Sequence, residues 1–363
     1  MLPPTHRAAV LYAPQDLRVE ERRTPEPGPG QVLVRIAAVG LCGSDLHYYA
    51  HGENGPNVLR TPTVLGHEAA GVIAATGPGA DRHAVGTPVA IEPAHPCGRC
   101  ARCRRGAYNQ CPHGTCYGSP PTDGALAAYV LAPEDFVHPL PDGLDLRHGA
   151  LIEPLAVAVH AVRRAGVRPG DRVLVTGAGP IGLLVLQVAR AAGADRIEVS
   201  DVSPQRLRYA EKWGATRTVD PATAQVVDAA PGMLADPDGF DVALDCSGNA
   251  GALVGALRAL RPGGTVAVVG NPATVATELP LAWMQRQEIT LVTAFRYAND
   301  FPAAIALAAT GRVRLAELVT SCHPLDASDA ALRAALTDPA QLKVLVTPET
   351  GPAGGNSQGA HHG

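Results

Sequence analysis

Residues 173–184, VLVTGAGPIGLL, decide the fold of the second half of the chain. A short apolar strand runs into the pattern G-x-G-x-x-G, and the last glycine opens an apolar helix pattern. In such a turn the first glycine permits the tight bend, the second lets the backbone approach a pyrophosphate, and the third allows close helix packing. The motif therefore predicts a dinucleotide site at a helix N-terminus, where free N–H groups and the helix dipole hold phosphates. The predicted cofactor contacts in this turn are Gly177, Gly179, Pro180, Ile181 and Gly182.

Asp201 ends the next predicted strand, RIEVSD, nineteen residues after Gly182. A carboxylate there accepts hydrogen bonds from the adenosine ribose and repels a 2′-phosphate, which favours NAD over NADP. Arg206 could instead accommodate that phosphate, or it could stack near adenine or lie on a solvated helix face. A purely structural glycine-rich turn is the alternative for the whole motif, but the spacing and the flanking elements favour a nucleotide site.

Strand and helix patterns alternate on both sides of this motif, from Arg172 to about Gly270. The alternation predicts a parallel sheet covered by helices on both faces. The strand patterns are RVLVTG, RIEVSD, TRTVD, DVALDCSG and TVAVVG. The helix patterns are PIGLLVLQVARAAG, PQRLRYAEKWG and AGALVGALRALRPGG.

Before Pro154 the sequence consists of short β-like runs broken by glycine and proline, which predicts a compact, mostly β domain. These runs are QVLVRIAAVG, AAGVIAATG, TPVAIEP and ALAAYVLAP. After about Leu281 the chain continues with EITLVTAF, a helical stretch from Phe301 to Ala309 and a final strand, LKVLVTP. This last part could form a separate lobe or return to the first domain.

The length of 363 residues suggests two domains. A net charge of −4 without a basic run argues against nucleic-acid binding, which needs many phosphate contacts. No apolar stretch is long enough to span a bilayer, and the N-terminal MLPPTHRAAV does not resemble a signal peptide. We therefore expect a cytoplasmic protein without a membrane or nucleic-acid partner, and a flexible tail at residues 349–363.

Four cysteines lie within fifteen residues, in CGRCARCRRGAYNQC, with the spacing C-x2-C-x2-C-x7-C. Sulfur ligands two residues apart can meet one tetrahedral zinc at about 2.3 Å. Disulfides are the alternative, and the absence of a signal peptide disfavours them. Cys116 could be an alternative ligand, although a buried thiol is the simpler interpretation. Because four protein ligands leave no open position, the chemistry must lie elsewhere. The predicted structural zinc ligands are Cys97, Cys100, Cys103 and Cys111.

A catalytic metal needs about three protein ligands and one open position. Cys42 in VGLCGSDLHYYAHG and the pair His67 and Glu68 in VLGHEAAG are candidates for these ligands. Neither motif is diagnostic alone, because a lone buried cysteine is usually a small apolar residue. Combined with the four-cysteine lobe and the dinucleotide motif, they indicate a second metal site.

Together these motifs resemble the zinc-dependent medium-chain dehydrogenase/reductase superfamily, and the resemblance runs from about Arg7 to Pro348. The sorbitol (L-iditol) and xylitol dehydrogenase branch is the most similar one, through GLCGSDLHYY, VLGHEAAG, SPPTDGALAAY, GALIEPLAVAVHAVRR, GAGPIG and FRYAND. The resemblance implies an α/β protein. Its GroES-like, mostly β catalytic domain would comprise residues 1–154 and 294–348, with a structural zinc lobe at about 95–113. A Rossmann, doubly wound parallel sheet over 155–293 would bind the cofactor.

The resemblance also implies roles for individual residues. Cys42, His67 and Glu68 are the implied catalytic zinc ligands. Glu153 in LIEPLAV is the implied carboxylate that holds the zinc-bound water or, in some states, binds the metal itself. It stands where other alcohol dehydrogenases have a second zinc-binding cysteine.

Other implied roles concern proton transfer and substrate binding. Ser44 and His47 match the family's proton relay, although His47 could instead pack near the ribose. Asp45 matches the carboxylate that orients a ligand histidine. The implied substrate pocket, for which surface or packing roles are the alternative, contains Tyr48, Tyr117, Arg296 and Tyr297. The remaining cysteines, expected to be inert buried thiols, are Cys246 and Cys322.

The implied reaction oxidises a secondary hydroxyl of a polyol such as sorbitol, L-iditol or xylitol to a ketose, with hydride transfer to NAD. Threonine-, butanediol- and aminocyclitol-type zinc dehydrogenases are the alternatives. A catalytically inactive binding protein of the same fold is a further alternative, but it predicts missing ligands or relay groups, and all are present. The family implies two zinc ions per chain, one catalytic and one structural, and a homotetramer or homodimer.

Overall fold

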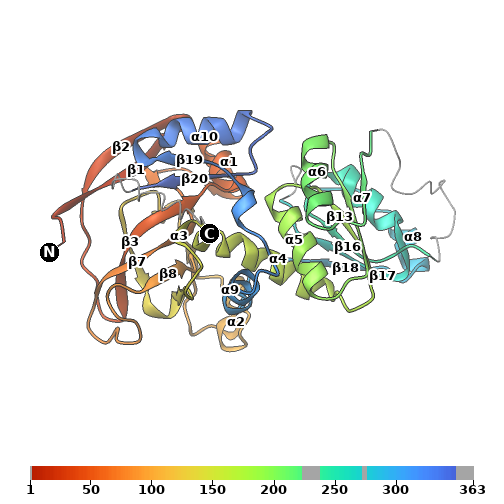
Figure 1. Ribbon diagram of the computed structural model, residues 1–363, viewed down its shortest axis with the longest axis horizontal. Helices are drawn as coiled ribbons and strands as arrows, with labels where there is room; N and C mark the ends of the chain where they lie inside the picture. Colours follow the sequence, from red (N-terminus) through yellow and green to blue (C-terminus); the bar gives the residue numbers. More distant parts are fainter. Residues whose placement is uncertain (1, 223–237, 272–275, 349–363) are drawn as a thin grey trace, which may run out of the picture.

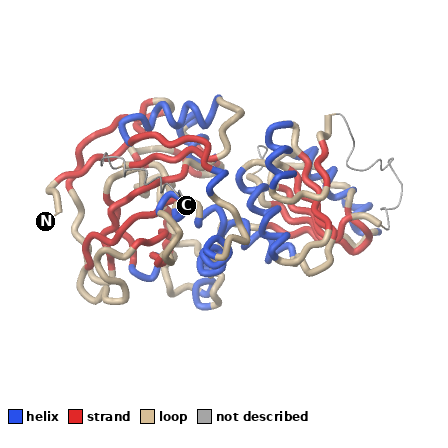
Figure 2. Tube along the Cα trace, viewed as in Figure 1, coloured by secondary structure: helices blue, strands red, loops and turns tan. Residues whose placement is uncertain are grey.

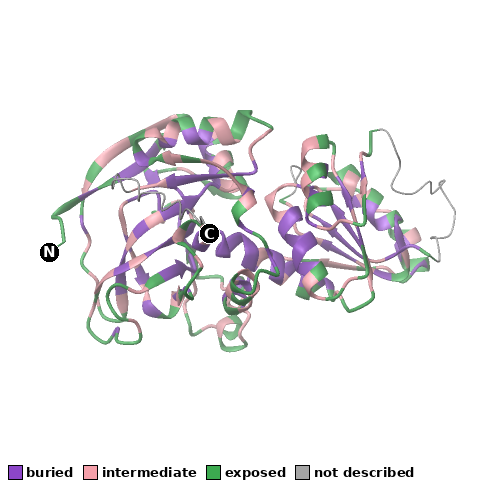
Figure 3. Ribbon diagram, in the orientation of Figure 1, coloured by how far each residue is buried: buried purple, intermediate pink, exposed green. Residues whose placement is uncertain are grey.

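The computed structural model describes residues 2–222, 238–271 and 276–348, so the predicted tail at 349–363 lies outside the described residues (Figure 1). Two bodies lie side by side, a β-rich body that contains the N-terminus and a smaller body of strands flanked by helices (Figures 1 and 2). In both bodies the buried residues lie along the strands and the inner helix faces (Figure 3). No described helix is long and apolar enough to cross a membrane.

The helix-flanked body contains one sheet of six parallel strands in the order β15-β14-β13-β16-β17-β18. This is the strand order of a doubly wound nucleotide-binding sheet, and the order reverses next to the strand that precedes the glycine motif. The elements of this body are β13 (Arg172–Thr176), α5 (Pro180–Ala191), β14 (Arg196–Ser200), α6 (Pro204–Lys212), β15 (Arg217–Val219), β16 (Phe240–Asp245), α7 (Ala250–Arg258), β17 (Leu260–Val268), α8 (Leu281–Arg286) and β18 (Thr290–Thr293). The predicted parallel sheet is therefore confirmed.

One helix prediction in this body was too long. The pattern AGALVGALRALRPGG suggested a helix as far as residue 264, but α7 ends at Arg258 and β17 begins at Leu260. Pro262 has no N–H to continue a helix, and Gly263 has a φ of 75°. The apolar residues after the helix instead pair with β16, where Phe240 lies opposite Leu260.

The β-rich body is built on a seven-stranded sheet in the order β12-β8-β7-β3-β20-β19, with β11 also paired to β3. Its last two strands come from the C-terminal part of the chain, because β20 pairs antiparallel with β3 (Leu345 opposite Gly40). Of the two alternatives for that part, the return to the first domain is therefore the observed one. The strands are β3 (Gln31–Gly40), β7 (Glu68–Thr76), β8 (Pro88–Ile91), β11 (Tyr129–Pro133), β12 (Val137–Pro139), β19 (Val319–Pro324) and β20 (Lys343–Thr347).

Smaller elements surround this sheet. A three-stranded sheet contains β2 (Asp16–Arg23), β1 (Thr5–Ala13) and β6 (Thr63–Val64). Two-stranded sheets pair β4 (Glu53–Asn54) with β5 (Asn57–Val58) and β9 (Ala94–His95) with β10 (Thr115–Cys116). The helices are α1 (Gly43–His51), α2 (Ala101–Arg104), α3 (Leu146–Gly149) and α10 (Ser328–Thr337). Four 3-10 turns complete the body: η1 (Tyr108–Gln110), η2 (Glu134–Phe136), η3 (Ala316–Leu318) and η4 (Leu325–Ala327).

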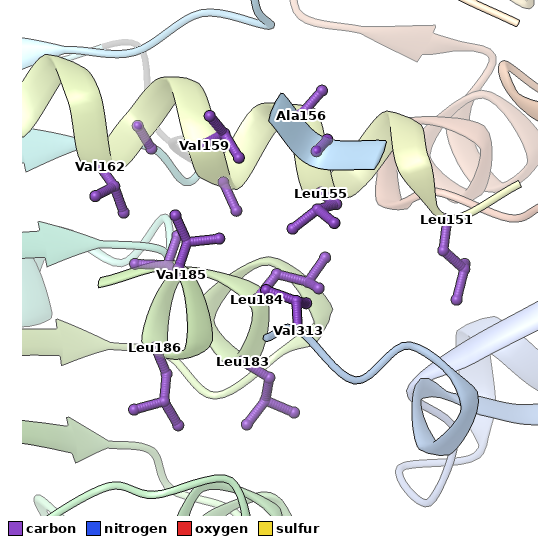
Figure 4. Packing of buried hydrophobic residues seen from close by; sticks show 14 of the residues in the cluster. Leu151, Leu155, Ala156, Val159, Val162, Leu183, Leu184, Val185, Leu186 and Val313 are labelled. Carbon is purple, nitrogen blue, oxygen red and sulfur yellow. The ribbon is translucent and has the colours of Figure 1, made fainter. Parts of the chain in front are cut away.

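Helix α4 (Ile152–Ala165) joins the two bodies, and α9 (Phe301–Ala309) packs beside it. Apolar side chains lie on almost every side of α4, which is the pattern of a helix buried on all faces. Figure 4 shows Leu155 and Val159 of α4 packed over Leu184 and Val185 of α5. The same buried cluster extends to Ala70 of β7, so one core continues through α4 from one body to the other. The N-terminus of α4, which carries Glu153, is thereby fixed next to the β-rich sheet.

Candidate active site

The four lobe cysteines lie together in a loop that includes the short helix α2. Their sulfur atoms are separated by 3.4 Å (Cys100 to Cys103), 3.9 Å (Cys100 to Cys111) and 4.0 Å (Cys97 to Cys103). A tetrahedron with zinc–sulfur bonds of about 2.3 Å has sulfur–sulfur edges of about 3.8 Å, so this donor set fits one zinc ion. All eight cysteines are free thiols, which contradicts the disulfide alternative. Backbone N–H groups of Arg99 and Cys100 lower the pKa of the Cys97 thiol to about 6 and so favour the thiolate that a metal binds.

A second group of possible ligands consists of Cys42, His67 and Glu68, whose donor atoms all lie within 4.8 Å of one another. Cys42 precedes α1 as its N-cap, and His67 stands directly before β7, which begins at Glu68. Gly40 on the neighbouring strand makes room for the glutamate, because a Cβ at residue 40 would lie 2.2 Å from Glu68 Oε2. That oxygen is buried and has no hydrogen-bond partner among the described residues, as expected for an atom whose partner is a metal.

Asp45 connects the two segments that carry Cys42 and His67. It is fully buried, and its two carboxylate oxygens accept the backbone N–H groups of Cys42 (2.9 Å) and Gly66 (3.0 Å). Its Oδ1 also lies 3.7 Å from His67 Nδ1. Although burial opposes the charge, the His67 imidazole and these N–H groups lower the pKa of Asp45. The carboxylate therefore holds the loop before α1 and the loop before β7 in one arrangement, and it lies close enough to His67 for the predicted role of orienting that histidine.

Lys343 is a site residue that the sequence analysis missed. Its Nζ donates to Glu68 Oε1 (2.7 Å) and to the carbonyl of Leu41 (3.1 Å), and the lysine is 4% exposed. A buried carboxylate without a partner is costly, so this lysine makes burial of Glu68 possible. Lys343 opens the last strand, 275 residues away in the sequence. Only its place as one of two lysines in an arginine-rich chain could have drawn attention to it.

Glu153 lies beside this group of ligands, on the first turn of α4. Burial raises the pKa of Glu153 to about 7; the charge of His67 lowers this pKa and the charge of Glu68 raises it. Because such charge effects act over short distances, the three side chains lie close together. Tyr297 is fully buried next to Glu153. Burial raises the pKa of its phenol, and the negative charge of Glu153 raises that pKa further. The Tyr297 hydroxyl has no direct hydrogen-bond partner among the described residues.

The predicted relay residues lie on α1. Ser44 is half-buried and His47 is exposed, with its ring 6.2 Å from that of His51. The two residues are three positions apart and share one helix face, which runs from the ligand group toward solvent. No interaction between Ser44 and His47 is found in the part of the chain described here.

The four predicted pocket residues differ in their surroundings. Tyr48 is buried, and its hydroxyl has no partner among described residues. Arg296 is half-buried and lies close enough to Cys116 to lower the pKa of that buried thiol, which burial raises. Tyr117, by contrast, donates its hydroxyl to the carbonyl of Leu131 and packs in the β-rich core. Its polar group is used inside that body, so we do not include Tyr117 in the proposed pocket.

The glycine motif lines a cleft of about 760 Å³ at the carboxyl ends of β13, β14 and β16. This is the edge where doubly wound sheets bind nucleotides. Gly177 and Gly179 line the cleft, whereas Pro180 and Ile181 form the first turn of α5. Gly182 packs against the turn itself, because a Cβ there would lie 1.8 Å from the carbonyl oxygen of Gly177. Any larger residue at 182 would push α5 away from the strand.

Asp201 and Arg206 both line the cleft. The Asp201 carboxylate accepts the backbone N–H groups of Ala178 (2.6 Å) and Ser203 (2.8 Å). Arg206 Nε is buried without a partner among the described atoms. The carboxylate therefore supports the glycine turn from the neighbouring strand, and both charged groups lie where an adenosine ribose would bind.

The remaining cysteines agree only partly with their predictions. Cys116 is buried, as expected, and is not part of the four-sulfur group. Cys246 is half-buried and lines the nucleotide cleft. The prediction for Cys322 was wrong, because this thiol is exposed. It lies on β19, the edge strand of its sheet, which pairs with β20 on one side and with no described strand on the other.

Comparison with known proteins agrees with this geometry. The model of the alcohol dehydrogenase GroES-like domain matches residues 28–142, and that of the zinc-binding dehydrogenase family matches residues 180–310. The chain is 39% identical to the sorbitol dehydrogenase of Bacillus subtilis (strain 168) over 348 residues, which cover 96% of this chain and 98% of the relative. It is 40% identical to D-xylulose reductase A of Aspergillus niger over 86% of this chain and 88% of the relative.

A solved structure with the same fold is a zinc-binding dehydrogenase from Sinorhizobium meliloti 1021 bound to NADP. It aligns with a TM-score of 0.86 and 33% identity over 95% of this chain and 99% of that chain. The chain thus belongs to the zinc-dependent medium-chain dehydrogenases, in their sorbitol and xylitol dehydrogenase branch. It is a zinc-dependent polyol dehydrogenase that uses a nicotinamide cofactor.

Proposed function

We propose that the chain oxidises a secondary hydroxyl of a polyol of the sorbitol, L-iditol or xylitol type to a ketose, with NAD as the hydride acceptor. The observation that carries the proposal is the fully buried Tyr297 hydroxyl, which lies beside the Glu153 carboxylate and makes no hydrogen bond of normal geometry with any described residue. Buried polar groups need partners, and a substrate with several hydroxyl groups supplies them. An alcohol with one hydroxyl group would leave this part of the pocket unsatisfied.

Two zinc ions per chain fit the two groups of donors. The four lobe sulfur atoms would hold a structural ion with no open position, and Cys42, His67 and Glu68 would hold a catalytic ion with room for substrate. When bound at the second group, zinc supplies a Lewis acid that makes the substrate hydroxyl more acidic. Asp45 and Lys343 fix the orientation of His67 and Glu68 from behind.

Glu153 is buried beside His67 and Glu68, and we assign to one of its carboxylate oxygens the role of accepting the proton when the substrate hydroxyl ionises. Ser44 and then His47 offer a route for the proton from the half-buried end of α1 to its exposed side.

NAD supplies the hydride acceptor, and the glycine turn would hold its pyrophosphate at the N-terminus of α5. We favour NAD over NADP because Asp201 lines the cleft and opposes a 2′-phosphate. Arg206 in the same cleft is the feature that would favour NADP.

We also propose that the chain forms a homotetramer or homodimer and acts in the cytoplasm. Strand β18 is at the edge of the nucleotide sheet and pairs only with β17 among the described strands, and the nearby Phe295 is 56% exposed. An open, apolar sheet edge is a surface that a second copy can cover. The eight free thiols suit a reducing compartment. Light scattering of the purified protein tests the oligomeric state.

The substrate proposal is tested by measuring NAD reduction with sorbitol, xylitol, ribitol, galactitol, inositols, 2,3-butanediol and threonine. We expect one acyclic polyol to give the highest kcat/KM. A higher value with threonine, butanediol or a cyclitol would replace the proposal by the corresponding alternative. Metal analysis of the same preparation should give about two zinc ions per chain.

A further inference from the structure

The segment Phe295–Asp300 connects β18 of the nucleotide sheet to α9 and contains Arg296 and Tyr297 of the proposed pocket. Its backbone is strained at two places, because Arg296 and Asn299 have φ angles of 51° and 61°. Residues other than glycine adopt positive φ angles of this size only where the surrounding contacts hold them there. The contacts that hold the segment therefore decide where the Arg296 and Tyr297 side chains point.

The four-cysteine lobe supplies three of these contacts. Asn109 Nδ2 donates to the carbonyl of Phe295 (2.8 Å), the backbone N–H of Asn299 donates to Tyr108 Oη (2.7 Å), and Asn299 Nδ2 donates to the carbonyl of Gly106 (3.1 Å). Tyr108 and Asn109 form the 3-10 turn η1, which lies between the third and fourth lobe cysteines. The lobe thus forms hydrogen bonds with the segment on both sides of Arg296 and Tyr297.

The lobe end of this contact is itself fixed. Tyr108 Oη donates to Glu92 Oε1 (2.6 Å), and the other oxygen of the buried Glu92 meets His138 Nε2 (2.8 Å). His138 stacks on Phe301, the first residue of α9, with ring centroids 4.8 Å apart. One hydroxyl, that of Tyr108, therefore connects the substrate segment to the core of the β-rich body.

Helix α4 holds the other end of the segment. The buried Asp300 carboxylate binds His160 Nδ1 (2.9 Å), Arg163 and the backbone N–H of Ala298 (3.1 Å). His160 and Arg163 are on the same helix that carries Glu153 at its first turn. Tyr297 thus lies between two anchors, one on the cysteine lobe and one on α4, and next to the proposed proton acceptor.

We propose that the four-cysteine lobe sets polyol specificity, and that Tyr108 and Asn109 are positioning residues that hold Arg296 and Tyr297 against the substrate. The inference rests on the proposed function, since it assigns a role to the pocket of that reaction. It gives the structural metal centre a task in substrate binding, because the lobe must be folded for η1 to reach the segment.

The test compares Tyr108→Phe and Asn109→Ala with a matched control, Tyr12→Phe. Tyr12 also donates its hydroxyl to a glutamate (Glu20 Oε2, 2.6 Å), but it lies on β1, remote from the segment. For each variant, kcat and KM are measured with the best polyol and with cyclohexanol, which has a single secondary hydroxyl. NADH affinity, zinc content and hydrogen exchange of the peptide covering 294–300 are measured in parallel.

We expect KM for the polyol to rise roughly tenfold in Tyr108→Phe and Asn109→Ala, the loss that one positioning hydrogen bond represents. Values for cyclohexanol, NADH affinity and zinc content should stay within about twofold, and hydrogen exchange of residues 294–300 should become faster. The control variant should show none of these changes. A double-mutant cycle with Tyr297→Phe should be non-additive in polyol KM, because both changes remove one interaction.

Equal losses for polyol and cyclohexanol, unchanged exchange of residues 294–300 or additive effects in the cycle would each overturn the positioning role. Failure of the proposed function is distinguishable, because it shows in the unaltered protein as a preferred substrate that is not a polyol. Should Asn109→Ala fail to fold, Tyr108→Phe alone decides, since it removes only one oxygen atom.

Discussion

The two groups of metal ligands in this molecule differ in how they are built. The four-cysteine group comes from fifteen consecutive residues near the surface, and its sulfur atoms already have tetrahedral spacing. The group of Cys42, His67 and Glu68 comes from the loop before α1 and from the start of β7, and it depends on buried charges at Asp45 and Lys343. A metal site with four protein ligands can be formed by one local loop. A site with three protein ligands needs the surrounding body to fix those ligands, so that the fourth coordination position stays free for substrate.

The largest expected effect is the loss of catalytic activity when a ligand of the Cys42, His67 and Glu68 group is removed. Cys42→Ser and His67→Ala should each lower kcat/KM by about 10³-fold or more, because the Lewis acid is lost, while NADH affinity stays within about twofold. Steady-state kinetics and NADH fluorescence titration check this. Cys322→Ser is the matched control, since that thiol is exposed and belongs to neither group, and it should leave the kinetics unchanged. Near-normal turnover in His67→Ala would refute the assignment.

The closed group should behave in the opposite way. Cys100→Ser should lower the free energy of unfolding by roughly 4 kcal/mol, because a structural metal is lost, while the folded protein keeps most of its kcat. Urea unfolding with metal analysis measures the first quantity, and assays below the unfolding range measure the second. If Cys100→Ser lost as much kcat as His67→Ala, the distinction between a structural and a catalytic group would be wrong.

The dependence of the open group on buried charge can be measured with the two lysines of the chain. Lys343→Met leaves Glu68 buried without its cation and should lower the free energy of unfolding by about 3 kcal/mol. Lys212→Met removes an exposed partner of Glu317 at a similar distance, 2.6 Å against 2.7 Å, and should cost less than about 1 kcal/mol. Urea unfolding compares the two variants. Equal costs would mean that burial of the ion pair is not what matters.

The nucleotide site extends the comparison, because its main residues come from one continuous motif and one neighbouring strand. Asp201→Gly with Arg206 retained should raise the NADP-to-NAD ratio of kcat/KM by roughly tenfold, since repulsion of the 2′-phosphate is lost. Glu198→Gln is the control, because Glu198 lies on β14, just before Asp201, and pairs with Arg217 instead of lining the cleft. An unchanged NADP-to-NAD ratio in Asp201→Gly would mean that a group other than Asp201 discriminates between NAD and NADP.

Prediction from the sequence succeeded where a site or element depends on neighbouring residues. The turn that opens α5, the grouping of the four cysteines and the helix at Phe301–Ala309 are of this kind, whereas the nucleotide and the zinc ion expected at the first two stay predictions. It failed where a proline and a glycine ended a helix pattern earlier than its apolar residues suggested, at Arg258, and where the sheet edge exposed Cys322. Lys343 was missed because its partner is 275 residues away.

The amino-acid sequence alone was enough to predict the parallel sheet from its periodicity and the four-cysteine group from its spacing. The family and the ligands Cys42, His67 and Glu68 came from the resemblance of their motifs to known dehydrogenases. Three features became visible only in the folded chain: Lys343 neutralises Glu68, Tyr117 turns its hydroxyl into the β-rich body, and the cysteine lobe holds the segment that carries Tyr297. The physical reason is that these interactions join distant segments. Which groups meet is set by the packing of β20, α4 and η1 around one core, and no local pattern encodes that packing.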